Sequence, residues 1–270
     1  MKRVTDFARF RAESNPISMV TCYDAWSARV IADSPIDAVL VGDSVAMVMH
    51  GFPDTVHATT EMMASHTAAV RRGIGDKFVV TDIPFPEHRK GIQAAMEAVD
   101  QVMKAGANAV KIEGASGHLE VISHIVESGV PVMGHLGLTP QSVHQLGGYR
   151  VQGKDEAAAR KLEEDALALQ DAGAFSIVFE CIPADLAAKI TRSLEIPTIG
   201  IGSGPDCSGQ ILVLQDLLGL NKGFRPKFLR TYAEGADTFQ RALTHYDMDV
   251  KGGKYPSIEE SFTDGKLRNH

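Results

Sequence analysis

Residues 78–113, FVVTDIPFPEHRKGIQAAMEAVDQVMKAGANAVKIE, contain two short apolar runs separated by a longer amphipathic segment. The runs Phe78–Asp82 and Ala109–Glu113 are almost continuously apolar, as parallel strands buried on both faces are. Gly91–Lys104 has the apolar spacing of a helix, and Gly106 follows its last turn, where a positive φ suits glycine. The stretch therefore predicts one strand–helix–strand unit of a parallel sheet.

The same alternation continues in both directions through most of the chain. The predicted strands are Ile17–Tyr23, Ala38–Gly42, Phe78–Asp82, Ala109–Glu113, Pro131–His135, Phe175–Glu180, Pro197–Ile201 and Gln210–Leu214. The predicted helices are Ser27–Ala32, Thr60–Arg72, Gly91–Lys104, His118–Glu127, Asp155–Gln170, Asp185–Ser193 and Lys227–Tyr246. This pattern predicts an α/β fold, a (β/α)8 TIM barrel, with a doubly wound open sheet as the alternative.

The domain organisation follows from length and from the lack of an internal linker. The chain has 270 residues, close to the roughly 250 that are typical of one such barrel. No Ser/Pro-rich stretch or shift in composition divides it. We therefore predict a single catalytic barrel over residues 1–251, followed by a polar tail over residues 252–270 that packs on the barrel or on a neighbouring subunit.

Composition and charge exclude several classes of function. The formal net charge is −7, which argues against a nucleic-acid partner or an anionic membrane surface. The three cysteines form no CxxC pair, and no stretch approaches the ~18–20 uncharged apolar residues of a membrane span. The first residues also lack the apolar core of a signal peptide. We therefore expect a cytoplasmic protein.

Five successive predicted strands end at a charged or proton-handling residue. These residues are Asp43, which Ser44 follows, and then Asp82, Glu113, His135 and Glu180. A carboxylate after a strand is often only a helix cap or a loop residue. In a TIM barrel, however, the carboxyl ends of the strands carry the active site. Since the five strands are neighbours, we expect their side chains to meet in one pocket.

The residue types in this group indicate its chemistry. Lys111 lies two residues before Glu113, so both side chains face the same side of an extended strand. A lysine among apolar residues needs an acidic partner or an anionic ligand. The carboxylates of Asp43, Asp82 and Glu113 favour a hard, oxygen-seeking cation such as Mg²⁺. A zinc site is disfavoured, because the sequence contains no HExxH motif.

Five segments together carry a resemblance to a known family. They are Val41–Ser44 (VGDS), Asp82–Phe85 (DIPF), Val110–Gly114 (VKIEG), Gly134–Gln141 (GHLGLTPQ) and Phe179–Pro183 (FECIP). In this order the chain resembles the 3-methyl-2-oxobutanoate (ketopantoate) hydroxymethyltransferases of pantothenate and coenzyme A biosynthesis. The resemblance extends from about Ile17 to the helix near Tyr232. Ser203 replaces the usual alanine, a change that bears on loop shape more than on chemistry.

The resemblance implies an enzyme with a Mg²⁺-dependent barrel of the pyruvate/phosphoenolpyruvate type. Its activity would be hydroxymethyl transfer from 5,10-methylenetetrahydrofolate to 2-oxoisovalerate, through Mg²⁺-assisted enolisation and aldol-type addition. The implied metal positions are Asp43, Asp82 and Glu113, and Glu180 is the implied proton acceptor. The implied substrate contacts are Asp43, Ser44, Asp82, Lys111 and His135. The resemblance also implies a ring-like homo-oligomer, often a homodecamer.

Two other functions remain as alternatives. The first is a C–C lyase or phosphonomutase built on a related barrel, which commonly uses a Lys-Cys-Gly loop that this sequence does not contain. The second is a scaffold without catalytic activity, in which the polar residues at the strand ends would be purely structural. Dependence of the activity on folate distinguishes a hydroxymethyltransferase from the first alternative. Loss of Mg²⁺ affinity would favour the second.

Overall fold

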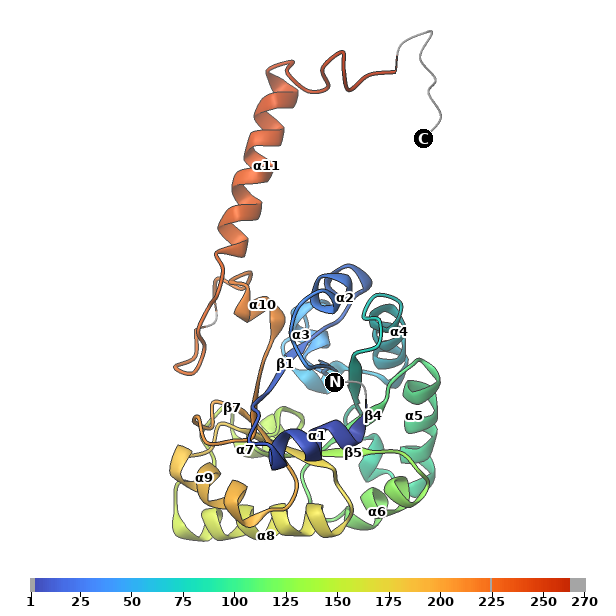
Figure 1. The fold of residues 1–270 in the computed structure, drawn as a ribbon, viewed down its shortest axis with the longest axis vertical. Coiled ribbons are helices and arrows are strands. Elements are labelled where there is room, and N and C mark those ends of the chain that lie inside the picture. The colour runs from blue at the N-terminus through green and yellow to red at the C-terminus, as the bar shows by residue number, and fades with distance from the viewer. Residues whose placement is uncertain (1–2, 224, 263–270) are drawn as a thin grey trace. The chain divides into compact units, whose positions relative to one another are not determined.

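The computed structural model describes residues 3–223 and 225–262 and contains a closed barrel of parallel strands (Figure 1). The strands are β1 Ile17–Thr21, β2 Ala38–Val41, β3 Phe78–Asp82, β4 Ala109–Glu113, β5 Val132–Gly137, β6 Ser176–Glu180, β7 Thr198–Ile201 and β8 Gly209–Leu212. Each strand pairs with the next, and β8 pairs with β1. The predicted TIM barrel is confirmed, and the open sheet is wrong because the β1–β8 pairing closes the ring.

Helices α4, α5, α6, α8 and α9 lie around the outside of this barrel (Figure 1). The helices are α1 Val4–Ala12, α2 Ala25–Ala32, α3 Val45–Val48, α4 Thr60–Arg71, α5 Ile92–Lys104, α6 Leu119–Glu127, α7 Val143–Leu146, α8 Glu156–Asp171, α9 Ala184–Ser193, α10 Leu214–Leu217 and α11 Gly235–Lys251. The side chains of Asp24, Thr59 and Asp155 cap α2, α4 and α8, because each accepts a hydrogen bond from a backbone N–H group in the first turn. Gly106, with a φ of 112°, ends α5 as predicted, and Gly173, with a φ of 91°, ends α8 in the same way.

Two of the longer helices differ from the sequence prediction, and the four-residue helices α3, α7 and α10 are absent from it. The predicted helix Lys227–Tyr246 begins only at Gly235 and continues to Lys251. Its expected first turns are absent because Tyr232 N–H donates to Leu217 O instead of to a carbonyl four residues earlier. Helix α1 was not predicted, because Phe7 is its only buried side chain and the apolar periodicity is weak.

The chain divides into two compact units, Met1–Leu214 and Gln215–His270. The first unit contains every strand of the barrel, and the second contains α11. Residues 263–270 of the predicted tail lie outside the described residues. The extent of the catalytic domain, 1–251, stays a prediction. Among the residues that the structure describes, no helix is long and apolar enough to cross a membrane.

The barrel interior is apolar toward the amino ends of the strands. Its core consists of Phe7, Ile17, Met19, Ala38, Leu40, Phe78, Val80, Ala109, Met133, Val178, Ile199 and Ile211. Phe7 of α1 packs against Phe78 and Phe175, with ring centroids 5.4 and 5.0 Å apart. Side chains alternate along a strand, so the next inward position after Val80 is Asp82. The polar site therefore lies on top of the apolar core, at the carboxyl ends of the strands.

Candidate active site

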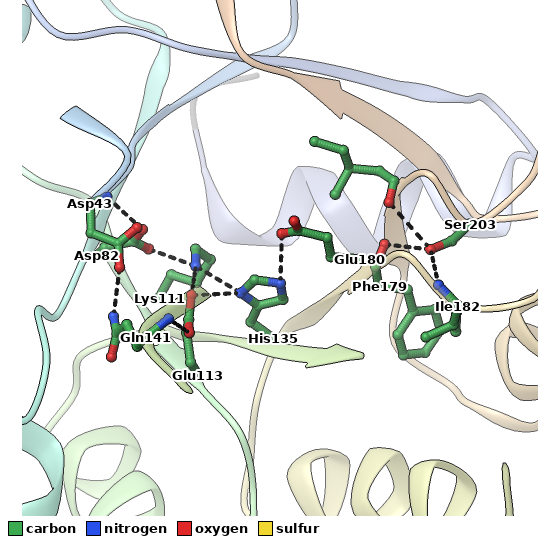
Figure 2. Close-up of polar contacts among 11 residues, drawn as sticks. Asp43, Asp82, Lys111, Glu113, His135, Gln141, Phe179, Glu180, Ile182 and Ser203 are labelled. Carbon is green, nitrogen blue, oxygen red and sulfur yellow. Dashed lines mark hydrogen bonds and ion pairs between the residues drawn. The ribbon is translucent and has the colours of Figure 1, made fainter. Parts of the chain in front are cut away.

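The strand register brings the predicted charged side chains together at one end of the barrel (Figure 2). Asp82 of β3 lies opposite Lys111 of β4. Glu113 of β4 lies opposite His135 of β5, while Glu180 ends β6. Since each follows an inward-facing apolar residue by two or four positions, all of them face the barrel interior. The expected convergence of these side chains is confirmed by their contacts.

Lys111 has two buried acidic neighbours. Its Nζ lies 3.0 Å from Asp82 Oδ1 and 3.7 Å from Glu113 Oε1, and its side chain is 4% exposed. The prediction that this lysine needs an acidic partner is therefore confirmed. Although burial disfavours the ammonium, Asp82 and Glu113 raise the pKa of Lys111 above its usual value. Lys111 is consequently a permanent cation in this site.

His135 links two of the carboxylates. Its Nδ1 lies 3.1 Å from Glu113 Oε1, and its Nε2 lies 3.3 Å from Glu180 Oε2. Burial and the nearby Lys111 disfavour a positive ring, but Glu113 and Glu180 outweigh them and raise the pKa of His135 to about 9. The shift favours the imidazolium form at neutral pH, paired with Glu113 through Nδ1 and with Glu180 through Nε2. Nδ1 also lies 3.1 Å from Lys111 Nζ, and Nε2 makes no hydrogen bond among the described residues.

This shift predicts a pH dependence of stability for the metal-free protein. The folded chain holds the pKa of His135 at about 9, above the ordinary value of 6.5. Its stabilising contribution is therefore complete below pH 6.5 and is lost as the pH rises through 9. We expect the free energy of unfolding, measured by urea titration in EDTA, to fall across this window by a few kcal/mol. In His135→Gln this part of the fall should disappear, and parallel pH profiles for the two proteins would contradict the assignment.

Gln141 connects two of the carboxylates, those of Asp43 and Glu113, and the backbone after β3. Its Nε2 donates to Asp43 Oδ2 at 2.9 Å and to Ile83 O at 3.0 Å. Its backbone N–H donates to Glu113 Oε2 at 3.0 Å. The search for polar residues at strand ends missed Gln141, because it lies in the loop after β5. Its place at the end of the GHLGLTPQ segment was the signal that could have found it.

The three predicted metal-site carboxylates differ in their electrostatic environment. Burial raises the pKa of Asp43 well above its usual value, and repulsion from Asp82 and Glu113 adds to this. Burial also raises the pKa of Asp82, although Lys111 opposes the rise. For Glu113 burial acts in the same direction, but His135 and Lys111 outweigh it and lower the pKa. The negative charge of Asp43 and Asp82 is therefore the less fully compensated.

The donor set of the site fits a divalent cation bound by few protein ligands. In residues 3–223 and 225–262, no group of three or more His, Cys, Asp or Glu side chains is arranged to hold a metal. Mg²⁺, however, usually takes only one or two protein carboxylates. Within the described chain, the buried Gln141 Oε1 receives no hydrogen bond, and Asp82 Oδ1 has only the Lys111 ammonium as a partner. The site also contains four carboxylates but only two side chains that can be cationic, Lys111 and His135. A divalent cation beside Asp43 and Asp82 would balance the charge.

Ser44 lies next to the aspartates at the start of α3. Its Oγ lies 2.7 Å from the hydroxyl of the buried Tyr23, a residue that no sequence pattern indicates as part of the site. A Cβ at Gly42 would lie 2.9 Å from Ser44 Oγ and 3.6 Å from Asp82 Oδ2. A side chain at Gly42 would therefore displace the Ser44 hydroxyl from its present position.

Glu180 is the most accessible carboxylate of the group, with 18% of its side chain exposed. Its carbonyl accepts a hydrogen bond from Leu138 N–H at 2.8 Å. Cys181, the next residue, has a φ of 49°, in the left-handed region that non-glycine residues rarely adopt. The chain thus turns sharply after Glu180, and the turn is held against β5. Such constrained backbone is typical of functional sites.

Gly137 allows the close approach of β5 to Glu180. Its φ is 95°, and a Cβ there would lie 2.2 Å from Glu180 O. Gly148 has a φ of 108° with no atom within 4 Å of its Cβ position, so Gly148→Ala is a matched control for backbone strain. We expect about 1–3 kcal/mol of strain in each alanine variant and a further loss of about 1–3 kcal/mol from the clash in Gly137→Ala. Urea titration measures both, and equal losses would contradict a special role for Gly137.

Residues 1–258 match the family model described as ketopantoate hydroxymethyltransferase. The chain belongs to this family. A 3-methyl-2-oxobutanoate hydroxymethyltransferase of Bdellovibrio bacteriovorus is 59% identical over 97% of this chain and 100% of its own length. Relatives of the same name from Coxiella burnetii and Legionella pneumophila are 53% and 52% identical, over 94% and 96% of this chain and 96% and 100% of theirs. The family resemblance seen in the motifs is confirmed, and the chain is a hydroxymethyltransferase.

Solved structures with low sequence identity share the barrel of this ketopantoate hydroxymethyltransferase family member. A 2,3-dimethylmalate lyase of the PEP mutase/isocitrate lyase superfamily has a TM-score of 0.61 at 16% identity, over 98% of this chain and 93% of that one. A phosphonopyruvate hydrolase in complex with oxalate and Mg²⁺ has a TM-score of 0.62 at 11% identity, over 96% and 93%. These structures therefore share the fold of the barrel described above.

Proposed function

We propose that this enzyme transfers a hydroxymethyl group from 5,10-methylenetetrahydrofolate to 3-methyl-2-oxobutanoate, giving 2-dehydropantoate in pantothenate and coenzyme A biosynthesis. Family membership and relatives that match over nearly the whole chain support this activity. The observation that carries the assignment is the position of Glu180, which is partly exposed and lies 3.3 Å from the His135 ring. A basic carboxylate beside a buried cluster of charged groups suits proton abstraction next to a keto group.

We propose Mg²⁺ as the cofactor, held by Asp43, Asp82 and Glu113. Asp43 and Asp82 have the uncompensated charge that favours direct binding. The oxygens of Glu113 already contact His135 and Gln141, so its contribution is either a direct bond or a bond through water. When bound, Mg²⁺ supplies a Lewis acid that polarises the keto oxygen and makes the proton at C3 of the oxoacid more acidic.

Each of the other residues has a role in this proposal. Glu180 accepts the C3 proton as the C–H bond breaks, and His135 holds the Glu180 carboxylate in place. Lys111 and Ser44 bind the carboxylate and keto oxygens of the oxoacid. C3 of the resulting enolate then forms a bond with the one-carbon unit. Both C–N bonds of the one-carbon unit break, one as this C–C bond forms and the other as water supplies the hydroxyl oxygen. The C3 proton held by Glu180 and one proton of that water go to the two nitrogens of tetrahydrofolate.

Proton NMR of 3-methyl-2-oxobutanoate in D₂O tests the activity in one series of samples. We expect C3 deuteration with Mg²⁺ that stops in EDTA, and formation of 2-dehydropantoate once methylenetetrahydrofolate is added. Deuteration without product would support the enolising site but contradict the donor. An absence of exchange in all samples would overturn the mechanism and favour the scaffold alternative.

We also propose that the enzyme works in the cytoplasm as a homo-oligomer, with no nucleic-acid or membrane partner. Phe239, Leu243, Tyr246 and Val250 are exposed and recur along one face of α11. A continuous apolar face of this kind is typical of a protein interface. Sedimentation velocity would measure the state, and a homodecamer is the expected assembly. A monomer at micromolar concentration would contradict this part of the proposal.

A further inference from the structure

A cavity of about 440 Å³ lies between the loop that follows β3 and the loop that follows β4. These loops begin at Asp82 and Glu113, so the cavity is at the same end of the barrel as the candidate active site. Its lining includes His88, Arg89 and His118, none of which has a role in the proposed proton transfer. The cavity is therefore a candidate for a separate binding subsite.

Two helix N-termini contribute to the wall of this cavity. Helix α5 starts at Ile92 after Gly91, and α6 starts at Leu119 after His118, and all four residues line the cavity. Neither helix start has a side-chain cap in the described structure. The first N–H groups of a helix have no partner within it and carry the positive end of the helix dipole. Two such ends facing one cavity offer backbone donors to an anion.

His88 independently indicates a missing polar ligand. The residue is 1% exposed, and among the described residues neither ring nitrogen has a hydrogen-bond partner. Burial lowers the pKa of His88 to about 3, so the ring is neutral and has one N–H to donate. A buried donor that remains unsatisfied costs free energy. The ring packs edge-on against His118, with centroids 4.7 Å apart, and both rings line the cavity.

The charged side chains of the lining have opposite signs. Arg89 is exposed, and its Nη1 donates to Ser116 O at 3.4 Å, so the guanidinium is held near the cavity with other N–H groups to spare. Glu120, in the first turn of α6, is the acidic residue of the lining. An anion in the cavity would thus be attracted by Arg89 and repelled by Glu120.

We infer that this cavity binds a carboxylate of the glutamate tail of the one-carbon donor. The inference rests on the proposed donor, methylenetetrahydrofolate. The carboxylate of the oxoacid already has Lys111 as its cationic partner within the main site. The donor is a long molecule whose carboxylates lie far from its reacting carbon, so it needs an anion subsite away from Glu180. The cavity has the donors for that group, in loops next to the strands that carry the site.

The test compares two donors in matched variants of the full enzyme. Methylenetetrahydropteroate carries the same one-carbon unit but has no glutamate tail. Arg89→Gln should raise KM for methylenetetrahydrofolate about tenfold, the loss of one charge-assisted contact, and should leave KM for the pteroate analogue unchanged. Glu120→Gln should lower KM for the folate alone. Lys90→Gln is the control, because Lys90 pairs with Glu87 at 2.6 Å and does not line the cavity, so neither KM should change.

Folate-free C3 deuteration separates failure of this inference from failure of the proposed function. Arg89→Gln should deuterate the oxoacid at the unmutated rate, since the variant leaves the carboxylate site intact. If the unmutated enzyme does not exchange the proton at all, the proposed function fails first. If exchange is normal but Arg89→Gln changes both KM values equally, or neither, the tail assignment is wrong. Competition by inorganic phosphate that does not distinguish the two donors would indicate a site for a free anion and also overturn it.

Discussion

Glu180→Gln is expected to slow C3 deuteration and product formation by about 10²–10⁴-fold, the usual contribution of a positioned general base. Glutamine has the shape of glutamate and can still contact His135, but it has no basic carboxylate. The variant should therefore keep its affinity for the oxoacid in Mg²⁺, because Asp43, Asp82 and Lys111 are unchanged. NMR in D₂O measures the exchange, and calorimetry measures the binding.

Glu195→Gln is a suitable control, because Glu195 is an exposed carboxylate after α9, outside the site. It should exchange the C3 proton at the unmutated rate. Exchange at the unmutated rate in Glu180→Gln as well would place the base elsewhere. Loss of both exchange and oxoacid binding would indicate that Glu180 holds the site together through His135 and is not its base.

The predictable part of the fold and site is local in sequence. The apolar pattern of each strand and the polar residue at its end lie within about five consecutive positions. The period-two alternation then decides which side of the sheet each side chain faces. Asp82, Lys111, Glu113, His135 and Glu180 could be assigned to one end of a barrel for this reason. Their direct contacts then follow from a regular parallel register, which places Asp82 opposite Lys111 and Glu113 opposite His135.

The parts that could not be predicted depend on loops and on burial. Gln141 reaches Asp43 across 98 positions of sequence, through a loop whose course no periodicity specifies. Tyr23 joins the site only through the geometry of the turn after β1. The start of α11 is set by the hydrogen bond from Tyr232 to Leu217, which replaces a first helical turn. A strand-end pattern contains none of this information.

The balance of charge also becomes visible only in three dimensions. From the sequence, Asp43, Asp82 and Glu113 are three equivalent carboxylates. In the fold, Glu113 has its charge compensated by His135 and Lys111, whereas burial raises the pKa of Asp43 and of Asp82. This difference is the reason why we propose the two aspartates as the direct metal ligands. It also makes a specific experiment possible.

Asp82→Asn is expected to have opposite effects on oxoacid binding with and without Mg²⁺. Asp82 Oδ1 lies 3.0 Å from Lys111 Nζ, so its charge competes with an oxoacid carboxylate for the ammonium. In EDTA the variant should bind the oxoacid more tightly than the unmutated enzyme does. With Mg²⁺ its affinity should be at least about tenfold lower, because one of the two ligands that Mg²⁺ usually needs is lost. Calorimetry in the two conditions measures both effects.

Opposite effects on oxoacid binding in EDTA and in Mg²⁺ distinguish a metal ligand from a structural carboxylate. If Asp82 only neutralised Lys111, removing its charge would change oxoacid binding in the same direction in both conditions. A general loss of folding would weaken both equally, and Asp171→Asn, at the exposed end of α8, should change neither. Unchanged Mg²⁺-dependent binding in Asp82→Asn would remove this residue from the metal site and leave Asp43 and Glu113 as its protein ligands. Glu113 would then have to exchange its contact with His135 for the metal, and the pH dependence of stability assigned to His135 would diminish when Mg²⁺ is bound.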